Sequence, residues 1–74
     1  MKFTVLIAAQ VGKVGDVEKK LASQSIGEVS VVAGIYDLIL TIETDDPEHY
    51  RELILDVIHL IDGVEDTVTL LHLT

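Results

Sequence analysis

At the centre of the chain stands the stretch Gly34-Ile35-Tyr36-Asp37-Leu38-Ile39-Leu40, in which a glycine turn leads into an alternating apolar run. A second apolar run, residues 29–33, precedes the turn, so the pair indicates a β-hairpin. Because side chains alternate between the two faces of a strand, every second residue from Tyr36 to Ile42 shares one wholly apolar face. We therefore predict that this strand, residues 36–43, lies at the centre of a sheet with Asp37 at its functional end.

Strands and helices alternate around this hairpin. Residues 3–10, 28–33, 36–43 and 64–73 predict strands. One helix follows the loop of residues 11–15. A second begins at Pro47 with Asp46 as its cap, and Asp62-Gly63 stops it after residue 61. The order is therefore β-α-β-β-α-β, which folds most simply into a ferredoxin-like α+β sandwich. Right-handed crossovers then predict strand order 4-1-3-2, with both helices on one face of the sheet.

The two faces of this sheet differ less in polarity than the faces of a sheet that is solvated on one side. The helix-covered face is predicted to hold Phe3, Val5, Ile7, Val29, Val31, Leu38, Leu40, Ile42, Val68 and Leu70. The open face is predicted to hold Thr4, Leu6, Ala8, Ser30, Val32, Ile39, Thr41, Thr67, Thr69, Leu71 and Leu73. Such an apolar patch marks an association surface, and a second copy packed sheet on sheet, as in dimeric α+β barrels, is the natural partner.

Composition excludes several classes of function. The 74 residues form a single domain, 1–74, and 13 Asp plus Glu against five Lys plus Arg give a net charge of −8, which disfavours direct nucleic-acid binding. No apolar run approaches the ~18 residues of a membrane span, so no membrane partner is expected. The chain has no cysteine, which fits a reducing compartment, and we expect a cytoplasmic protein.

Several motifs resemble the effector-binding (RAM) domain of the Lrp/AsnC transcriptional regulators. The most specific is Gly34-x-Tyr36-Asp37 before an apolar strand, and Asp62-Gly63-Val64 and Thr67-x-Thr69 also fit. The resemblance spans essentially the whole chain, with Ile26-Gly27 where the family often has Pro-Gly. It implies an amino-acid effector, homodimers that assemble into rings up to an octamer, and full-length Lrp/AsnC regulators as partners in transcription regulation. The family's helix-turn-helix domain is missing, so we expect a stand-alone module with no DNA-binding domain.

No catalytic, metal or cofactor site is predicted. His49, His59 and His72 are not spaced with one another or with a carboxylate as metal ligands would be. There is no cysteine nucleophile, and the glycines Gly12 and Gly15 are too sparse for a phosphate-binding loop. The chain is therefore predicted not to be an enzyme and to need no cofactor.

A ligand site is predicted at the turn end of the sheet. The strand directions bring Gln10, Asp37 and Thr67 to that end. The alternation of apolar side chains along each strand places all three on the open face. We expect an α-amino acid to place its ammonium on Asp37 and its carboxylate on backbone N–H groups around Gly34. The hydroxyls of Thr67 and Thr69 and the amide of Gln10 would complete the contacts, and the resemblance adds Tyr36. Asp37 has an alternative role, which is to accept hydrogen bonds from backbone donors of the turn.

Two other readings stay open. The chain could be a purely structural oligomerisation domain, which would bind no amino acid. It could also be a small dimeric ferredoxin-like monooxygenase with a pocket between sheet and helices. The Val, Leu and Ile side chains predicted for the helix-facing side argue against the enzyme, because they leave no polar group inside to perform chemistry.

Overall fold

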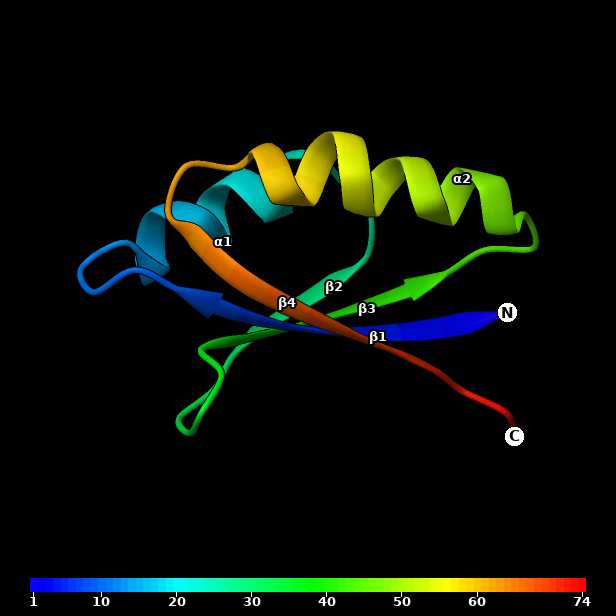
Figure 1. The fold of residues 1–74 in the computed structure, drawn as a ribbon, viewed down its shortest axis with the longest axis horizontal. Helices are drawn as coiled ribbons and strands as arrows, with labels where there is room; N and C mark the ends of the chain where they lie inside the picture. The colour runs from blue at the N-terminus through cyan, green and yellow to red at the C-terminus, as the bar shows by residue number, and fades with distance from the viewer.

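The computed structural model describes the backbone of residues 1–74 and the side chains of all of them except residues 47 and 55. It contains a four-stranded antiparallel sheet with the helices on one face (Figure 1). The elements are β1 (Lys2–Ala9), α1 (Val14–Ser23), β2 (Glu28–Val31), β3 (Leu38–Glu43), α2 (Pro47–Glu52), η1 (Leu53–Val57), η2 (Ile58–Leu60) and β4 (Val64–Leu71).

The strand order is β2-β3-β1-β4, which is the predicted 4-1-3-2 order taken from the other edge. All three strand pairs are antiparallel. The predicted ferredoxin-like α+β fold is thus confirmed. Both chain ends lie at the same end of the sheet, opposite the loop that joins β1 to α1 (Figure 1).

The core forms where the central strands face the helices. Alternate residues of β1 and β3 are almost completely buried there, as their apolar alternation predicts: Phe3, Val5, Ile7, Leu38, Leu40 and Ile42. The helical layer covers them with Val17, Leu21, Ile54, Ile58 and Ile61. The ring of Tyr50 stacks on the ring of Phe3 with centroids 3.8 Å apart, which closes the α2 end of this core.

The second helical segment begins as predicted and then departs from the α-helix. Asp46 caps α2, because its Oδ1 accepts a hydrogen bond from the Glu48 N–H at 3.0 Å. We predict one α-helix up to residue 61, whereas the chain widens into a π-helical turn over Leu53–Val57 and tightens into a 3₁₀ turn over Ile58–Leu60. The segment is rich in β-branched residues, whose side chains crowd the preceding turn of an α-helix.

The hairpin loop is longer than predicted. β2 ends at Val31 and β3 begins at Leu38, so residues 32–37, including Tyr36, lie in the loop rather than in strands. The loop projects away from the sheet on the side opposite the helices (Figure 1). One backbone hydrogen bond closes it, from the Val32 N–H to the Asp37 carbonyl at 2.9 Å.

The predicted faces of β4 are wrong, and a β-bulge is the reason. Ala9 pairs with Val64 and Ala8 pairs with Asp66, so Glu65 is an extra residue opposite β1. One extra residue moves every later side chain to the other face of the sheet. The helix side therefore receives Thr67, Thr69 and Leu71, which pair with Ile7, Val5 and Phe3. The open face receives Val68 and Leu70, which pair with Leu6 and Thr4.

Candidate functional site

Asp37 ends the pairing between β1 and β3. Its N–H donates to the Ile7 carbonyl at 2.9 Å, and its side-chain Oδ2 accepts from the Ala9 N–H at 2.8 Å. The carboxylate therefore stands where the next backbone carbonyl of the ladder would be. This half-buried side chain accepts from a backbone donor, as one of its two predicted roles requires, but the donor belongs to β1 and not to the turn. The second oxygen, Oδ1, has no hydrogen-bond partner among the described residues, and a ligand role for it stays a prediction.

Gly34, Tyr36 and Gln10 lie at the same end of the molecule as Asp37. Gly34 is exposed, and the space that a Cβ would occupy there is free of other atoms within 4 Å. Tyr36 is half-buried in the same loop. Gln10 follows Ala9 directly, and its backbone N–H donates to the Gly63 carbonyl at 2.7 Å, which leaves the exposed side chain outside this bond.

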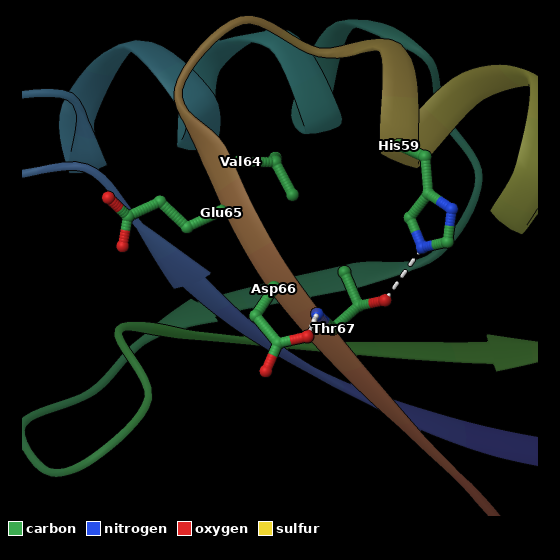
Figure 2. A pocket seen from close by; sticks show the side chains of 5 residues that line it. All are labelled: His59, Val64, Glu65, Asp66 and Thr67. Carbon is green, nitrogen blue, oxygen red and sulfur yellow. Dashed lines mark hydrogen bonds between the residues drawn. The ribbon is translucent and has the colours of Figure 1, made fainter.

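Thr67 and Thr69 do not lie on the face predicted for them. Thr67 reaches the same end of the sheet as Asp37, because both contact the backbone at Ile7, but the bulge turns it to the helix side. Its hydroxyl is within 2.8 Å of His59 Nε2, and Figure 2 shows the two side chains pointing toward each other. Thr69 pairs with Val5 on the same side. The predicted cluster of Gln10, Asp37 and Thr67 on one face is therefore wrong.

A hollow of about 290 Å³ lies beside this threonine, bordered by His59, Val64, Glu65, Asp66 and Thr67. The Asp66 carboxylate lies on the side of β4 away from His59 (Figure 2). It accepts a hydrogen bond from the Thr67 N–H at 2.9 Å. The hollow was not predicted, because the pairing of His59 with Thr67 depends on the bulge and leaves no spacing signal in the sequence. Of its polar side chains, His59 bonds to the Thr67 hydroxyl and Asp66 to the Thr67 N–H.

The described residues hold no group of three or more His, Cys, Asp or Glu side chains that could bind a metal ion. Buried polar or charged residues are likewise absent from the described core. Of the helices in the described residues, none is long and apolar enough to cross a membrane.

The sequence as a whole matches a known family model. The model of the Lrp/AsnC ligand-binding domain matches residues 3–74, which is almost the entire chain. The chain belongs to the Lrp/AsnC ligand-binding domain family. The resemblance carried by the Gly34-x-Tyr36-Asp37 motif is thereby confirmed. No curated protein matches the chain in sequence.

Solved structures with the same fold include proteins that are 30% identical to this chain in sequence. TTHA0845 from Thermus thermophilus superposes with a TM-score of 0.90, covering 99% of this chain and 92% of its own. FFRP-DM1, also 30% identical, has a TM-score of 0.87 and 93% coverage of both chains. E. coli AsnC is 19% identical with a TM-score of 0.82, and the match covers 99% of this chain and 50% of AsnC, which supports the fold alone.

In this Lrp/AsnC domain the corrected register changes which β4 side chains stand on the open face. Val68 and Leu70 are there in place of Thr67, Thr69 and Leu71, next to Leu6 and Ile39 on the central strands. Leu6, Ile39 and Val68 are only half-buried, and Leu70 is 49% exposed. A contiguous apolar surface thus runs across β3, β1 and β4 on the side that the helices leave uncovered.

Proposed function

We propose that this Lrp/AsnC domain is a regulatory module that senses an amino acid and assembles with itself, and that it modulates transcription through partner regulators in the cytoplasm. The observation that carries the proposal is the uncovered apolar face formed by Leu6, Ile39, Val68 and Leu70 in a chain of this family. The loop of residues 32–37 projects on that same side of the sheet, so a ligand there would lie near a contact between copies (Figure 1).

Assembly through the open face is tested by charge substitution. Leu6→Asp and Ile39→Asp place an unpaired charge in the proposed contact and should dissociate it, because burying such a charge is costly. Leu60→Asp is the matched control, since Leu60 is 77% exposed on η2 and lies outside the open face. Light scattering at micromolar concentration should show dimers or higher rings for the wild type and the control. A monomeric wild type would contradict the proposal.

The proposed amino-acid site uses Asp37, the Gly34 backbone, Tyr36 and Gln10. The ligand ammonium would bind Asp37 Oδ1, because Oδ2 already accepts from the Ala9 N–H. The ligand carboxylate would bind backbone N–H groups of the exposed loop near Gly34, where no side chain blocks approach. The amide of Gln10 can donate or accept beside them. Thr67 and Thr69 are left out of the proposed contacts because they face the helices.

The bond to Ala9 dictates which variant tests this site. Asp37→Ala would also orphan the Ala9 N–H, whereas Asp37→Asn keeps an acceptor oxygen and removes the charge. In calorimetry with the twenty amino acids, Asp37→Asn should weaken the effector by about tenfold, the effect of losing a charged partner. Asp66→Asn, which removes an exposed carboxylate on β4, should bind as the wild type does. Unchanged affinity in Asp37→Asn would place the effector elsewhere.

Direct DNA binding is not part of the proposal. The net charge of −8 repels a polyanion, so contact with DNA would come from full-length Lrp/AsnC regulators that assemble with this module. The chain alone should give no mobility shift at low micromolar concentration and low salt. A salt-sensitive shift without any other protein would refute this expectation.

A structural oligomerisation domain and a monooxygenase would each give a different experimental outcome. A purely structural oligomerisation domain would assemble and give no calorimetric signal with any amino acid. A monooxygenase needs polar groups between sheet and helices. The buried core of described residues there, including Val5, Leu40 and Ile58, is apolar, and the half-buried Thr67 on the same side already bonds to His59. That core favours the regulatory module over the enzyme.

A further inference from the structure

The open face ends in a row of charged side chains at the end of the sheet where both chain termini lie (Figure 1). Strand alternation places Lys2 on this face, because the next residue, Phe3, is buried under the helices. Glu43 pairs with Lys2 in the strand register and therefore shares its face. Glu28 pairs with Thr41, which precedes Glu43 by two residues on β3, so it stands on this face as well.

His72 completes the row from the other edge of the sheet. Its backbone N–H donates to the Lys2 carbonyl at 2.9 Å, so the pairing of the chain after β4 with β1 continues to this residue. Its ring Nε2 lies 2.5 Å from the hydroxyl oxygen of Thr4, which alternates with the buried Phe3 and so stands on the open face. The imidazole of His72 is thus held over the open face.

The four side chains divide this row into an acidic half and a basic half. In the strand order β2-β3-β1-β4, the acidic half is Glu28 on β2 with Glu43 on β3, and the basic half is Lys2 on β1 with His72 after β4. All four are exposed, and within the described residues none of them takes part in an ion pair. Protein interfaces surround an apolar centre with such a polar rim. The row therefore has the place and the composition of a rim for the apolar surface of the open face.

A second copy of this chain is the partner that the row fits. Two copies that pack through the same face are related by a two-fold axis between the sheets. If this axis runs along the strands, the β2 edge of one copy lies over the β4 edge of the other at the same end, and Glu43 faces the partner's Lys2. An axis across the strands would instead bring the partner's opposite end, with Asp66 on β4, over the row. Glu28 and Glu43 would then have no basic partner.

We propose that two copies pack with their strands aligned about a two-fold axis that runs along the strands between β3 and β1. Lys2 of each copy then pairs with the partner's Glu43, and His72 of each copy lies against the partner's Glu28. The proposal rests on the assembly through the open face proposed above and adds its orientation. Charge complementarity of this kind fixes the relative placement of two partners more than it adds affinity, because arrangements that bring like charges together are costly.

Two single charge reversals test this orientation when they are mixed. Lys2→Glu and Glu43→Lys each place like charges across the contact of their own dimer, so each alone should raise the dissociation constant about tenfold. A mixed dimer restores opposite charges in both contacts between the chains, while the like charges within each chain remain. Native mass spectrometry of an equimolar mixture, with one variant labelled with ¹⁵N, should therefore show mixed dimers well above the half expected from random pairing. Both variants keep a net negative charge, so overall attraction between them does not produce this preference.

Matched reversals on the helical layer are the control. Lys19→Glu on α1 and Glu48→Lys on α2 change the net charge equally at exposed positions outside the open face, and their mixture should pair at random. Random pairing of Lys2→Glu with Glu43→Lys, or a mixture that stays monomeric, would overturn the orientation. If Leu6→Asp still dissociated the wild-type assembly in that case, the proposed assembly would stand without it. A monomeric wild type would overturn both.

Discussion

The joint from α1 into β2 and the joint from η2 into β4 each place a glycine shortly before an edge strand, and the two glycines are needed for different reasons. At the first joint Gly27 lies against β3, and a Cβ added there would be 2.1 Å from the Thr41 carbonyl oxygen. At the second joint Gly63 adopts a φ of 100°, which residues with a Cβ strongly disfavour. Gly27 thus permits a close backbone approach, whereas Gly63 permits a backbone conformation.

The strands that follow the two joints also differ. β2 continues in regular register with β3, from Glu28 opposite Thr41 to Val31 opposite Leu38. β4 begins with Val64 on the helix side and then inserts Glu65 as a bulge, which exchanges the faces of the remaining strand. Similar joints therefore lead to one strand in regular register and one strand with a bulge. A glycine before a strand does not determine how that strand pairs.

The largest expected effect comes from Gly27→Ala. Its Cβ would clash with a backbone carbonyl that cannot move without opening the β2–β3 pair, so we expect a loss of about 3 kcal/mol or more in the free energy of unfolding. Gly15→Ala is the control, because Gly15 lies in α1 with nothing within 4 Å of its added Cβ. That control should gain up to about 1 kcal/mol from helix propensity. Denaturant unfolding at one protein concentration measures both, and equal stability of the two variants would contradict the packing assigned to Gly27.

The next largest effect tests which side chains of β4 face the helices. Thr69→Asp places a charge on the helix side against Val5 and should lower the free energy of unfolding by about 2 kcal/mol or more. Val68→Asp, one residue away, places the same charge on the open face and should dissociate the proposed assembly while the fold persists. Circular dichroism and light scattering separate the two outcomes. If the effects were exchanged, the bulge at Glu65 would be refuted.

Gly63→Ala should have a smaller effect than Gly27→Ala. The left-handed conformation costs a residue with a Cβ about 1–2 kcal/mol. The added atom would lie 2.8 Å from the Lys13 Cβ, a milder clash than the 2.1 Å from a backbone oxygen at Gly27. Gly63→Asn, which tolerates positive φ better, should recover part of this loss. Two variants of equal stability would show that crowding rather than conformation limits this joint.

The smallest effect is expected at Ser25, where α1 turns toward the first joint. Ser25 has a φ of 53°, so Ser25→Gly should raise the free energy of unfolding by about 0.5 kcal/mol. Ser23→Gly, inside α1, should lower it instead, because glycine is a poor helix former. Thermal unfolding of both variants would show shifts of opposite sign, and a decrease for Ser25→Gly would contradict the assigned conformation.

Much of the fold follows from local patterns. The alternation from Phe3 to Ile7 and from Leu38 to Ile42 predicts the two central strands, because only a strand places every second side chain in the core. Asp46 as a cap and the stop at Gly63 predict the bounds of the second helical segment. The Gly34-x-Tyr36-Asp37 motif predicts the family, which the match over residues 3–74 confirms.

What the sequence alone determined is thus the set of elements, their order, the central strands and the family. The tertiary structure decided which side of β4 faces the helices, because whether Glu65 is paired or bulged depends on how β4 fits against the end of β1 and not on its own residues. It also decided that one oxygen of Asp37 belongs to Ala9, and that the ring of His72 meets the hydroxyl of Thr4. These contacts join residues far apart in the chain, and no periodicity along a single strand or helix encodes them.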